Sequence, residues 1–91
     1  MTTQANIEIY SGSYCPYCSR AKALLKKLGA TFTEYDVQTD PTMLDTMLSR
    51  SNGARTIPQI FINNQHIGGC DDLYALNKTG KLERLLQQQP V

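Results

Sequence analysis

The pattern of apolar and polar residues in the first half of the chain predicts a strand, a helix and a second strand. Residues 7–10 (IEIY) alternate apolar and polar side chains, as in a short strand. Apolar residues then recur at helical spacing from Ala21 to Leu28, and Gly29 ends the predicted helix. Residues 31–37 alternate again. We expect this strand to be parallel to the first, because a helix connects them.

The next segment predicts a second helix and a hairpin. Asp40 and Pro41 have the residue types of an N-cap and a first helical residue, and residues 52–53 (NG) are typical of a helix end. Two short apolar runs, within residues 55–62 and 66–68, then flank an Asn-Asn turn, and Pro58 lies at the start of the first strand. This pattern predicts two antiparallel strands.

Two helices are expected to complete the chain. Asp71 and Asp72 are expected to cap the first of them, which Gly80 ends. Leu82, Leu85 and Leu86 lie on one side of a last short helix, and residues 87–90 are expected to fray.

The predicted order is therefore β-α-β-α-β-β-α with a short helical tail, an α/β fold. A mixed four-stranded sheet with helices on both faces covers such apolar strands. The 91 residues suit a single domain, 1–91, with its core at about residues 6–86. Met43 and Met47 are expected to fill this core rather than bind a metal.

Composition and charge narrow the function. A net charge of +1 argues against a nucleic acid as partner, and the basic residues of the first helix are expected to form a solvated face. No apolar run approaches the roughly 20 residues of a membrane span. The first residues lack the basic and apolar regions of a secretion signal. Together with three cysteines, this predicts a reducing, cytoplasmic location in which the thiols are working groups.

The clearest chemistry lies in residues 15–18 (CPYC), between the first strand and the first helix. Unpaired N–H groups and the positive end of the helix dipole favour a thiolate there, and the thiolate is the attacking species. Cys15 is nearer the helix start and is expected to be the nucleophile. Its thiol is expected to have a pKa well below the roughly 8.5 of a free thiol. Cys18 is expected to resolve the disulfide that Cys15 forms.

Two structural roles for this cysteine pair are less favoured. A structural zinc site needs about four N or S ligands, and the rest of the chain offers only Cys70 and His66. A structural disulfide across four residues constrains the unfolded chain little. We therefore favour redox chemistry without a bound metal, and expect His66 to be a surface strand residue rather than a base.

Three motifs together resemble one family closely, the dithiol glutaredoxins. They are residues 15–18 (CPYC), 56–58 (TIP) and 68–72 (GGCDD), in the order and spacing of that family. The similarity covers residues 7 to about 86 and is greatest to the small bacterial glutaredoxins that carry an extra cysteine after the double glycine. It implies the thioredoxin fold, with the strand and helix order given above.

The resemblance implies the activity and its co-substrate. Glutathione would be the co-substrate, the proteins acted on would carry disulfides or bound glutathione, and a monomer is expected. Pro58 would follow a cis bond, and glutathione would lie against the backbone of Ile57, as an added strand does. Its γ-glutamyl carboxylate would bind the backbone at a helix N-terminus. The implied glutathione site comprises Tyr17, Thr56, Ile57, Pro58, Gly69, Cys70, Asp71 and Asp72.

Two positions depart from the family pattern. Many members place a lysine where this chain has Gly12, and an amide or a cation where it has Asp45. We expect weaker binding of glutathione, unless Arg20, Arg50 or Arg55 replaces the missing cation.

Alternatives stay open for the function and for the third cysteine. One is a dimeric scaffold for a [2Fe–2S] cluster held by Cys15 and glutathione, although relatives with that task usually carry one active-site cysteine. Another is a thioredoxin-like reductase, disfavoured by Thr56, Asp72 and the absence of Trp. Cys70 is expected to be glutathionylated, to join a regulatory disulfide or to be inert.

Overall fold

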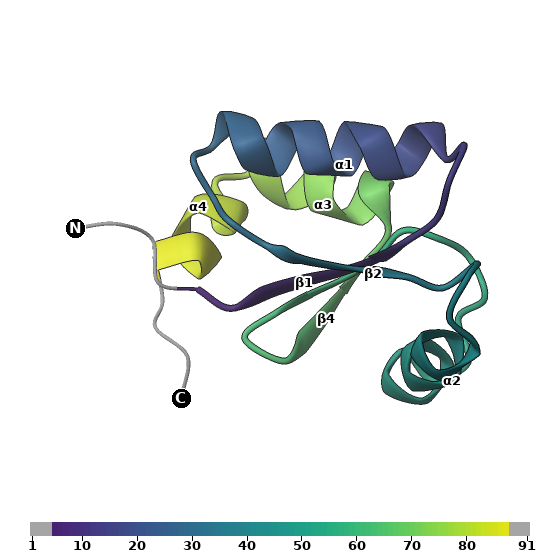
Figure 1. The fold of residues 1–91 in the computed structure, drawn as a ribbon. Coiled ribbons are helices and arrows are strands. Elements are labelled where there is room, and N and C mark those ends of the chain that lie inside the picture. The colour runs from purple at the N-terminus through teal and green to yellow at the C-terminus, as the bar shows by residue number, and fades with distance from the viewer. Residues whose placement is uncertain (1–4, 88–91) are drawn as a thin grey trace.

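The computed structural model describes residues 5–87, so the predicted fraying of residues 88–90 lies outside the described part of the chain. The order of elements is the predicted one (Figure 1). The elements are β1 (Ile7–Ser11), α1 (Pro16–Lys27), β2 (Thr33–Asp36), α2 (Pro41–Arg50), β3 (Gln59–Ile62), β4 (Gln65–Gly68), α3 (Cys70–Lys78) and α4 (Lys81–Gln87). Among the helices of residues 5–87, none has the length and apolar character needed to cross a membrane.

The four strands form one mixed sheet in the order β2-β1-β3-β4. β1 pairs with β2 in parallel, as predicted, because α1 carries the chain back across the sheet. β1 pairs antiparallel with β3, and β3 pairs antiparallel with β4. The side chains of the two central strands, β1 and β3, are accordingly more buried than those of the edge strands β2 and β4.

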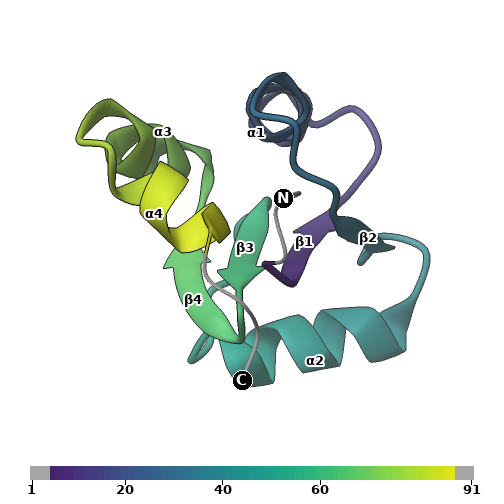
Figure 2. The ribbon, with the colours of Figure 1, turned by 90° about the vertical axis from the view of Figure 1, so that its left-hand side faces the viewer.

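Helices cover both faces of the sheet, which confirms the predicted architecture (Figure 2). On one face α1, α3 and α4 pack on the alternate residues Ile7 and Ile9 of β1 and on Ile60 of β3. On the other face α2 packs on the intervening side chains, such as Tyr10. Met47 of α2 is completely buried there, as expected for a core methionine.

Local chemistry explains where the first two helices begin and end. Cys15 is the N-cap of α1 and Pro16 its first residue, and Gly29 follows the helix end with a φ of 75°. The Asp40 carboxylate caps α2 by accepting hydrogen bonds from the N–H groups of Thr42 (3.0 Å) and Met43 (3.3 Å).

The hairpin has the predicted Asn-Asn turn. Asn63 and Asn64 alone make the turn, with φ values of 51° and 67°. Such a two-residue turn needs positive φ at both positions, which Asn tolerates. Gln65 therefore belongs to β4, where it pairs with Ile62. The first strand of the hairpin begins at Gln59, one residue after the predicted start at Pro58.

The start of α3 also differs from the prediction. Gly69 is the N-cap and Cys70 the first helical residue, so Asp71 and Asp72 lie inside the first turn. Asp72 still contributes to the cap, because its carboxylate accepts a hydrogen bond from the N–H of Gly69 at 3.0 Å.

Candidate active site

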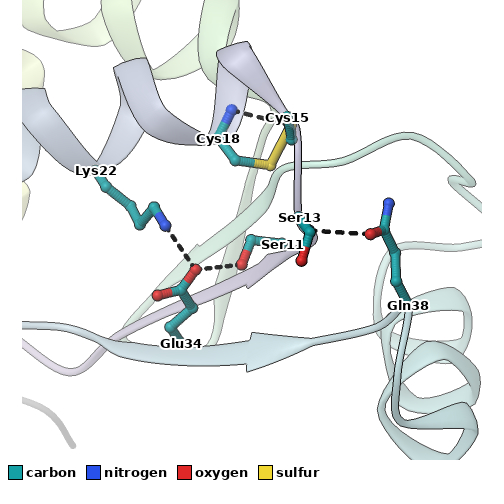
Figure 3. A network of polar contacts seen from close by, with 7 residues as sticks. All are labelled: Ser11, Ser13, Cys15, Cys18, Lys22, Glu34 and Gln38. Atoms are coloured by element: carbon teal, nitrogen blue, oxygen red, sulfur yellow. Dashed lines mark hydrogen bonds and ion pairs between the residues drawn. A yellow bond between two sulfur atoms is a disulfide. The ribbon is translucent and has the colours of Figure 1, made fainter.

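The two cysteines of the CPYC motif lie at the turn from β1 into α1 and are joined as a disulfide, with their Cα atoms 5.2 Å apart (Figure 3). Cys15 is partly exposed, whereas Cys18 is 1% exposed. The N–H of Cys18 points at the sulfur of Cys15, 3.1 Å away. An N–H directed at sulfur favours the negative form of that sulfur. A substrate can therefore reach Cys15, and the helix start stabilises charge there.

Residues of β2 and of the loop that follows it hold the segment before Cys15 (Figure 3). The side-chain oxygen of Gln38 accepts a hydrogen bond from the N–H of Ser13 at 2.9 Å. Ser11 donates to the carboxylate of Glu34, which also pairs with Lys22 at 2.8 Å. The end of β1 and the loop that follows it are thus each held by one contact. Neither contact was predicted from the residue pattern.

The hydrogen bonds from Lys22 and then Ser11 lower the pKa of Glu34 below its usual 4.5, against an opposing contribution from burial. Lys22 pairs with Glu34, and its side chain is 26% exposed. It is therefore less exposed than expected for a residue of a solvated basic face. The other basic residues of α1, Arg20, Lys26 and Lys27, are exposed as predicted.

A groove of about 570 Å³ lies beside the cysteine pair. It is lined by all eight residues of the implied glutathione site, from three separate segments of the chain. The carbonyl oxygen of Ile57 is 3.9 Å from the sulfur of Cys15, which places the groove directly beside this cysteine. The Ile57–Pro58 peptide bond is cis, as the resemblance implied. The remaining lining residues, Ala54, Gln59, His66 and Gly68, were not among the predicted site residues.

A buried glutamine supports the floor of this groove. Gln59 is 3% exposed, and its amide nitrogen donates to the carbonyl oxygen of Thr56 at 2.9 Å and to the Thr56 hydroxyl at 3.1 Å. Its amide oxygen lies 2.6 Å from a ring nitrogen of His66, which is exposed and stacks on Phe61. The sequence signal for this role was a polar residue, Gln59, within the apolar run at 57–62. A buried amide needs hydrogen-bond partners, so a glutamine there indicates a structural role.

The N-terminus of α3 forms another wall of the groove. The backbone N–H groups of Cys70 and Asp71 belong to the first turn, where helix N–H groups have no partner within the helix. The Cys70 side chain itself is buried, and burial raises the pKa of its thiol. Of the three roles left open for Cys70, this burial favours the inert one.

The three candidate replacement cations differ in their surroundings. Arg50 pairs with Glu8 at 2.9 Å, donates to the Tyr10 hydroxyl at 2.8 Å and lies over the ring of Phe61. It is therefore committed to the α2 face of the sheet. Arg20 lies over the ring of Tyr74, 5.4 Å from its centre. Arg55 is exposed and stands between two residues that line the groove.

The structure also shows where the two residues that depart from the family pattern lie. Asp45 is exposed on α2 and does not line the groove. Gly12 is covered by the side chain of Gln38, and a Cβ atom at this position would collide with that amide. The absence of a lysine at position 12 therefore goes together with the presence of Gln38.

A strand, a Cys-X-X-Cys pair at a helix start and an adjoining groove define a thiol–disulfide oxidoreductase site. Comparisons agree: the glutaredoxin family model matches residues 7–67, more than half of the chain. A probable glutaredoxin of Synechocystis sp. is 55% identical over 86 residues, which cover 94% of this chain and 98% of that protein.

Two solved structures extend this similarity to the fold. The glutaredoxin from Brucella melitensis has a TM-score of 0.80 at 49% identity, covering 96% of this chain and 92% of that one. The buckwheat glutaredoxin–glutathione complex has a TM-score of 0.81 at 34% identity, covering 90% and 76%. This chain belongs to the glutaredoxin family, the glutathione-dependent thiol–disulfide oxidoreductases of the thioredoxin fold.

Proposed function

We propose that Cys15 is the nucleophile that reduces mixed disulfides between glutathione and proteins. Its thiolate attacks the glutathione sulfur, a new bond from Cys15 forms, and the old disulfide breaks. The protein thiolate leaves and takes a proton from water. A second glutathione thiolate then attacks the glutathione sulfur on Cys15, which releases the Cys15 thiolate and forms glutathione disulfide.

Cys18 serves a second route, the reduction of protein disulfides. Here the Cys15 thiolate attacks one sulfur of the protein disulfide, the disulfide bond breaks, and the other protein sulfur leaves as a thiolate that takes the Cys18 proton. The Cys18 thiolate then attacks the Cys15 sulfur and expels the first protein sulfur as a second thiolate, which takes a proton from water. The pair is left as the disulfide seen in the structure, which two glutathione molecules reduce. The burial of Cys18 supports this order, because only Cys15 is accessible to an incoming substrate.

The groove provides the site for glutathione. The extended backbone of glutathione lies against the backbone of Ile57. Tyr17, which is 54% exposed, packs beside the glutathione. The γ-glutamyl carboxylate accepts hydrogen bonds from the N–H groups of Cys70 and Asp71, where the helix dipole favours an anion. Asp72 receives the ammonium group. The similarity to a glutaredoxin solved with glutathione supports this placement.

Arg55 is the proposed partner for the glycine carboxylate of glutathione. Arg50 is bonded elsewhere, and Arg20 lies against Tyr74. Arg55 is exposed beside the groove, and no hydrogen bond or ion pair engages it within the described residues.

The protein acts as a monomer in a reducing cytoplasm, on glutathionylated proteins and protein disulfides, without a bound metal. The two cysteines and the whole groove come from one chain, which supports a complete site in a single copy. Visible absorbance of the freshly purified protein, together with its mass in solution, distinguishes this state from an iron–sulfur dimer.

One observation carries the proposal: the groove that contains all eight implied residues opens beside the sulfur of the accessible cysteine. The test is turnover of the mixed disulfide of glutathione and 2-mercaptoethanol, with glutathione, NADPH and glutathione reductase for recycling. Glutathione-dependent oxidation of NADPH is expected. Turnover that requires thioredoxin reductase instead of glutathione would overturn the proposal.

A further inference from the structure

Tyr14, the residue before the nucleophile, has an unusual combination of exposure and backbone geometry. Its relative exposure is 103%, the highest among the large apolar and aromatic side chains of the described residues. Its φ is 55°, in the left-handed region that non-glycine residues seldom adopt. A fully exposed aromatic ring in a disfavoured backbone conformation contributes little to the stability of the fold.

The surrounding loop holds Tyr14 in this position. Gln38 accepts the hydrogen bond from Ser13, immediately before Tyr14 (Figure 3). The Gln38 side chain also lies against Gly12. On the other side, Cys15 is fixed as the N-cap of α1. The residues on both sides are therefore anchored, and the outward direction of Tyr14 is part of the loop structure.

Within the described part of the chain, the Tyr14 side chain makes no hydrogen bond, ring contact or ion pair. Tyr17, on the other side of Cys15, lines the groove, whereas Tyr14 does not. Two exposed tyrosines therefore flank the nucleophile, and only one of them belongs to the proposed glutathione site.

This division matters for a substrate in which glutathione is bonded to a protein. Glutathione occupies the groove. The protein part of the substrate therefore has to contact residues near Cys15 that do not line the groove. Tyr14 is the exposed residue next to Cys15 in the chain, and it does not line the groove. Residues 12–19 contain no charged side chain, so a contact made by the Tyr14 ring there is apolar rather than ionic.

We propose that Tyr14 is a specificity-determining residue, whose ring packs against the protein part of a glutathionylated substrate. Gln38 is the positioning residue that holds the ring in place through Ser13. This inference rests on the proposed function, since it requires glutathione to occupy the groove. It predicts that Tyr14 favours protein substrates over small mixed disulfides that share the same reacting atoms.

The test compares kcat/KM for glutathionylated serum albumin with kcat/KM for the mixed disulfide of glutathione and 2-mercaptoethanol. Tyr14→Ala and Tyr14→Asn remove the ring, and Asn also suits a positive φ, so that variant keeps the backbone. In both variants the ratio of protein to small-substrate kcat/KM is expected to fall about two- to tenfold, the size of one aromatic contact. The fall should be the same at low and high salt.

Matched variants separate the ring from other effects. Tyr14→Phe keeps the ring, and Leu28→Ala removes another exposed apolar side chain at the far end of α1. Both are expected to keep the wild-type ratio. Gln38→Ala should lower the ratio, because it removes the acceptor for the Ser13 N–H. Gln38→Glu retains an acceptor oxygen and should keep the wild-type ratio.

An unchanged ratio in Tyr14→Ala and Tyr14→Asn would overturn the inference while leaving the proposed function intact. Equal losses on both substrates would also overturn it, because the ring would then act on the chemistry or on glutathione. If wild-type protein fails on the small mixed disulfide itself, the proposed function fails, and this inference fails with it.

Discussion

The backbone N–H of Cys18 donates to the sulfur of Cys15 over 3.1 Å, so the second cysteine caps the first through its backbone and not only through its thiol. This contact depends on the start of α1, not on the Cys18 side chain. Replacing that side chain should therefore leave the environment of Cys15 largely intact.

We expect Cys15→Ser to abolish all turnover and Cys18→Ser to affect only one route. Glutathione itself releases the intermediate during reduction of a mixed disulfide, so Cys18→Ser should retain that activity. It should lose most reduction of protein disulfides, which needs the buried second thiol. Parallel assays on both substrates check this, and an equal loss in both single variants would contradict the division.

Gly68→Ala is expected to weaken glutathione binding and destabilise the fold. Gly68 has a φ of 117°, and an added Cβ would collide with the Asp72 carboxylate. The strain should cost about 1–3 kcal/mol, and displacement of Asp72 should raise the KM for glutathione. Denaturant unfolding and steady-state kinetics measure the two effects.

Gly80→Ala is the matched control for this variant. Gly80 has a φ of 80°, yet no atom lies within 4 Å of an added Cβ. Stability should therefore fall while the KM for glutathione stays the same. A raised KM in both variants would mean that loss of stability, rather than the position of Asp72, governs binding.

Much of the fold was predictable because its signals are local. Asp40 and Pro41 cap α2 in the expected way, and the three motifs of the site come together at one groove. The N-cap of α3 was placed two residues too late because a glycine N-cap has no side chain to reveal it. Asp72 has the residue type of a cap but acts from inside the helix.

What the sequence did not reveal depends on contacts between distant residues. Gln38 lies against Gly12 and Ser13, although 25 residues separate its amide from its partner at Ser13. Gln59 is a polar residue in an apolar strand, and only its pairing with Thr56 and His66 shows its role. No periodic pattern along the chain records such pairs.

Arg50 and Arg55 should separate stability from glutathione binding. Arg50→Ala leaves the Glu8 carboxylate, whose side chain is 15% exposed, without its cation. We expect a loss of about 1.5–3 kcal/mol in the free energy of unfolding, with the KM for glutathione unchanged. Arg55→Ala should leave stability unchanged and raise that KM a few-fold. The opposite result would assign the glycine carboxylate to Arg50.

Glu34 should make stability depend on pH in a defined direction. Its pKa is lowered in the folded protein, so the carboxylate stabilises the fold above its usual pKa of 4.5 and this stabilisation is lost as the pH falls through the lowered value. Because the Glu34 side chain is 39% exposed, we expect less than about 1 kcal/mol.

The measurement is denaturant unfolding of wild type and Glu34→Gln at pH 6 and pH 3. Wild type should lose more stability than the variant on acidification. Lys22→Met should reduce the difference, because the hydrogen bond from Lys22 is the largest cause of the lowered pKa. Parallel losses in wild type and Glu34→Gln would show that the network contributes nothing to acid sensitivity.

Gly12→Lys should improve glutathione binding only when Gln38 is also changed. A lysine would add a cation near the groove, worth about 0.2–1 kcal/mol if exposed, which corresponds to a few-fold lower KM at low salt. Its Cβ, however, would occupy the space of the Gln38 side chain and break the hydrogen bond to Ser13. The single variant therefore gains a charge and loses a loop anchor.

The double variant Gly12→Lys/Gln38→Ala removes the collision, and Gln38→Ala alone reports the cost of losing the anchor. Relative to Gln38→Ala, the double variant should show the few-fold lower KM for glutathione at low salt and little difference at high salt. If the two agree at low salt, the added cation does not contact glutathione. Arg55→Ala in the double variant then decides the matter: a raised KM would show that Arg55 already holds the glycine carboxylate, and an unchanged KM would show that neither cation binds it.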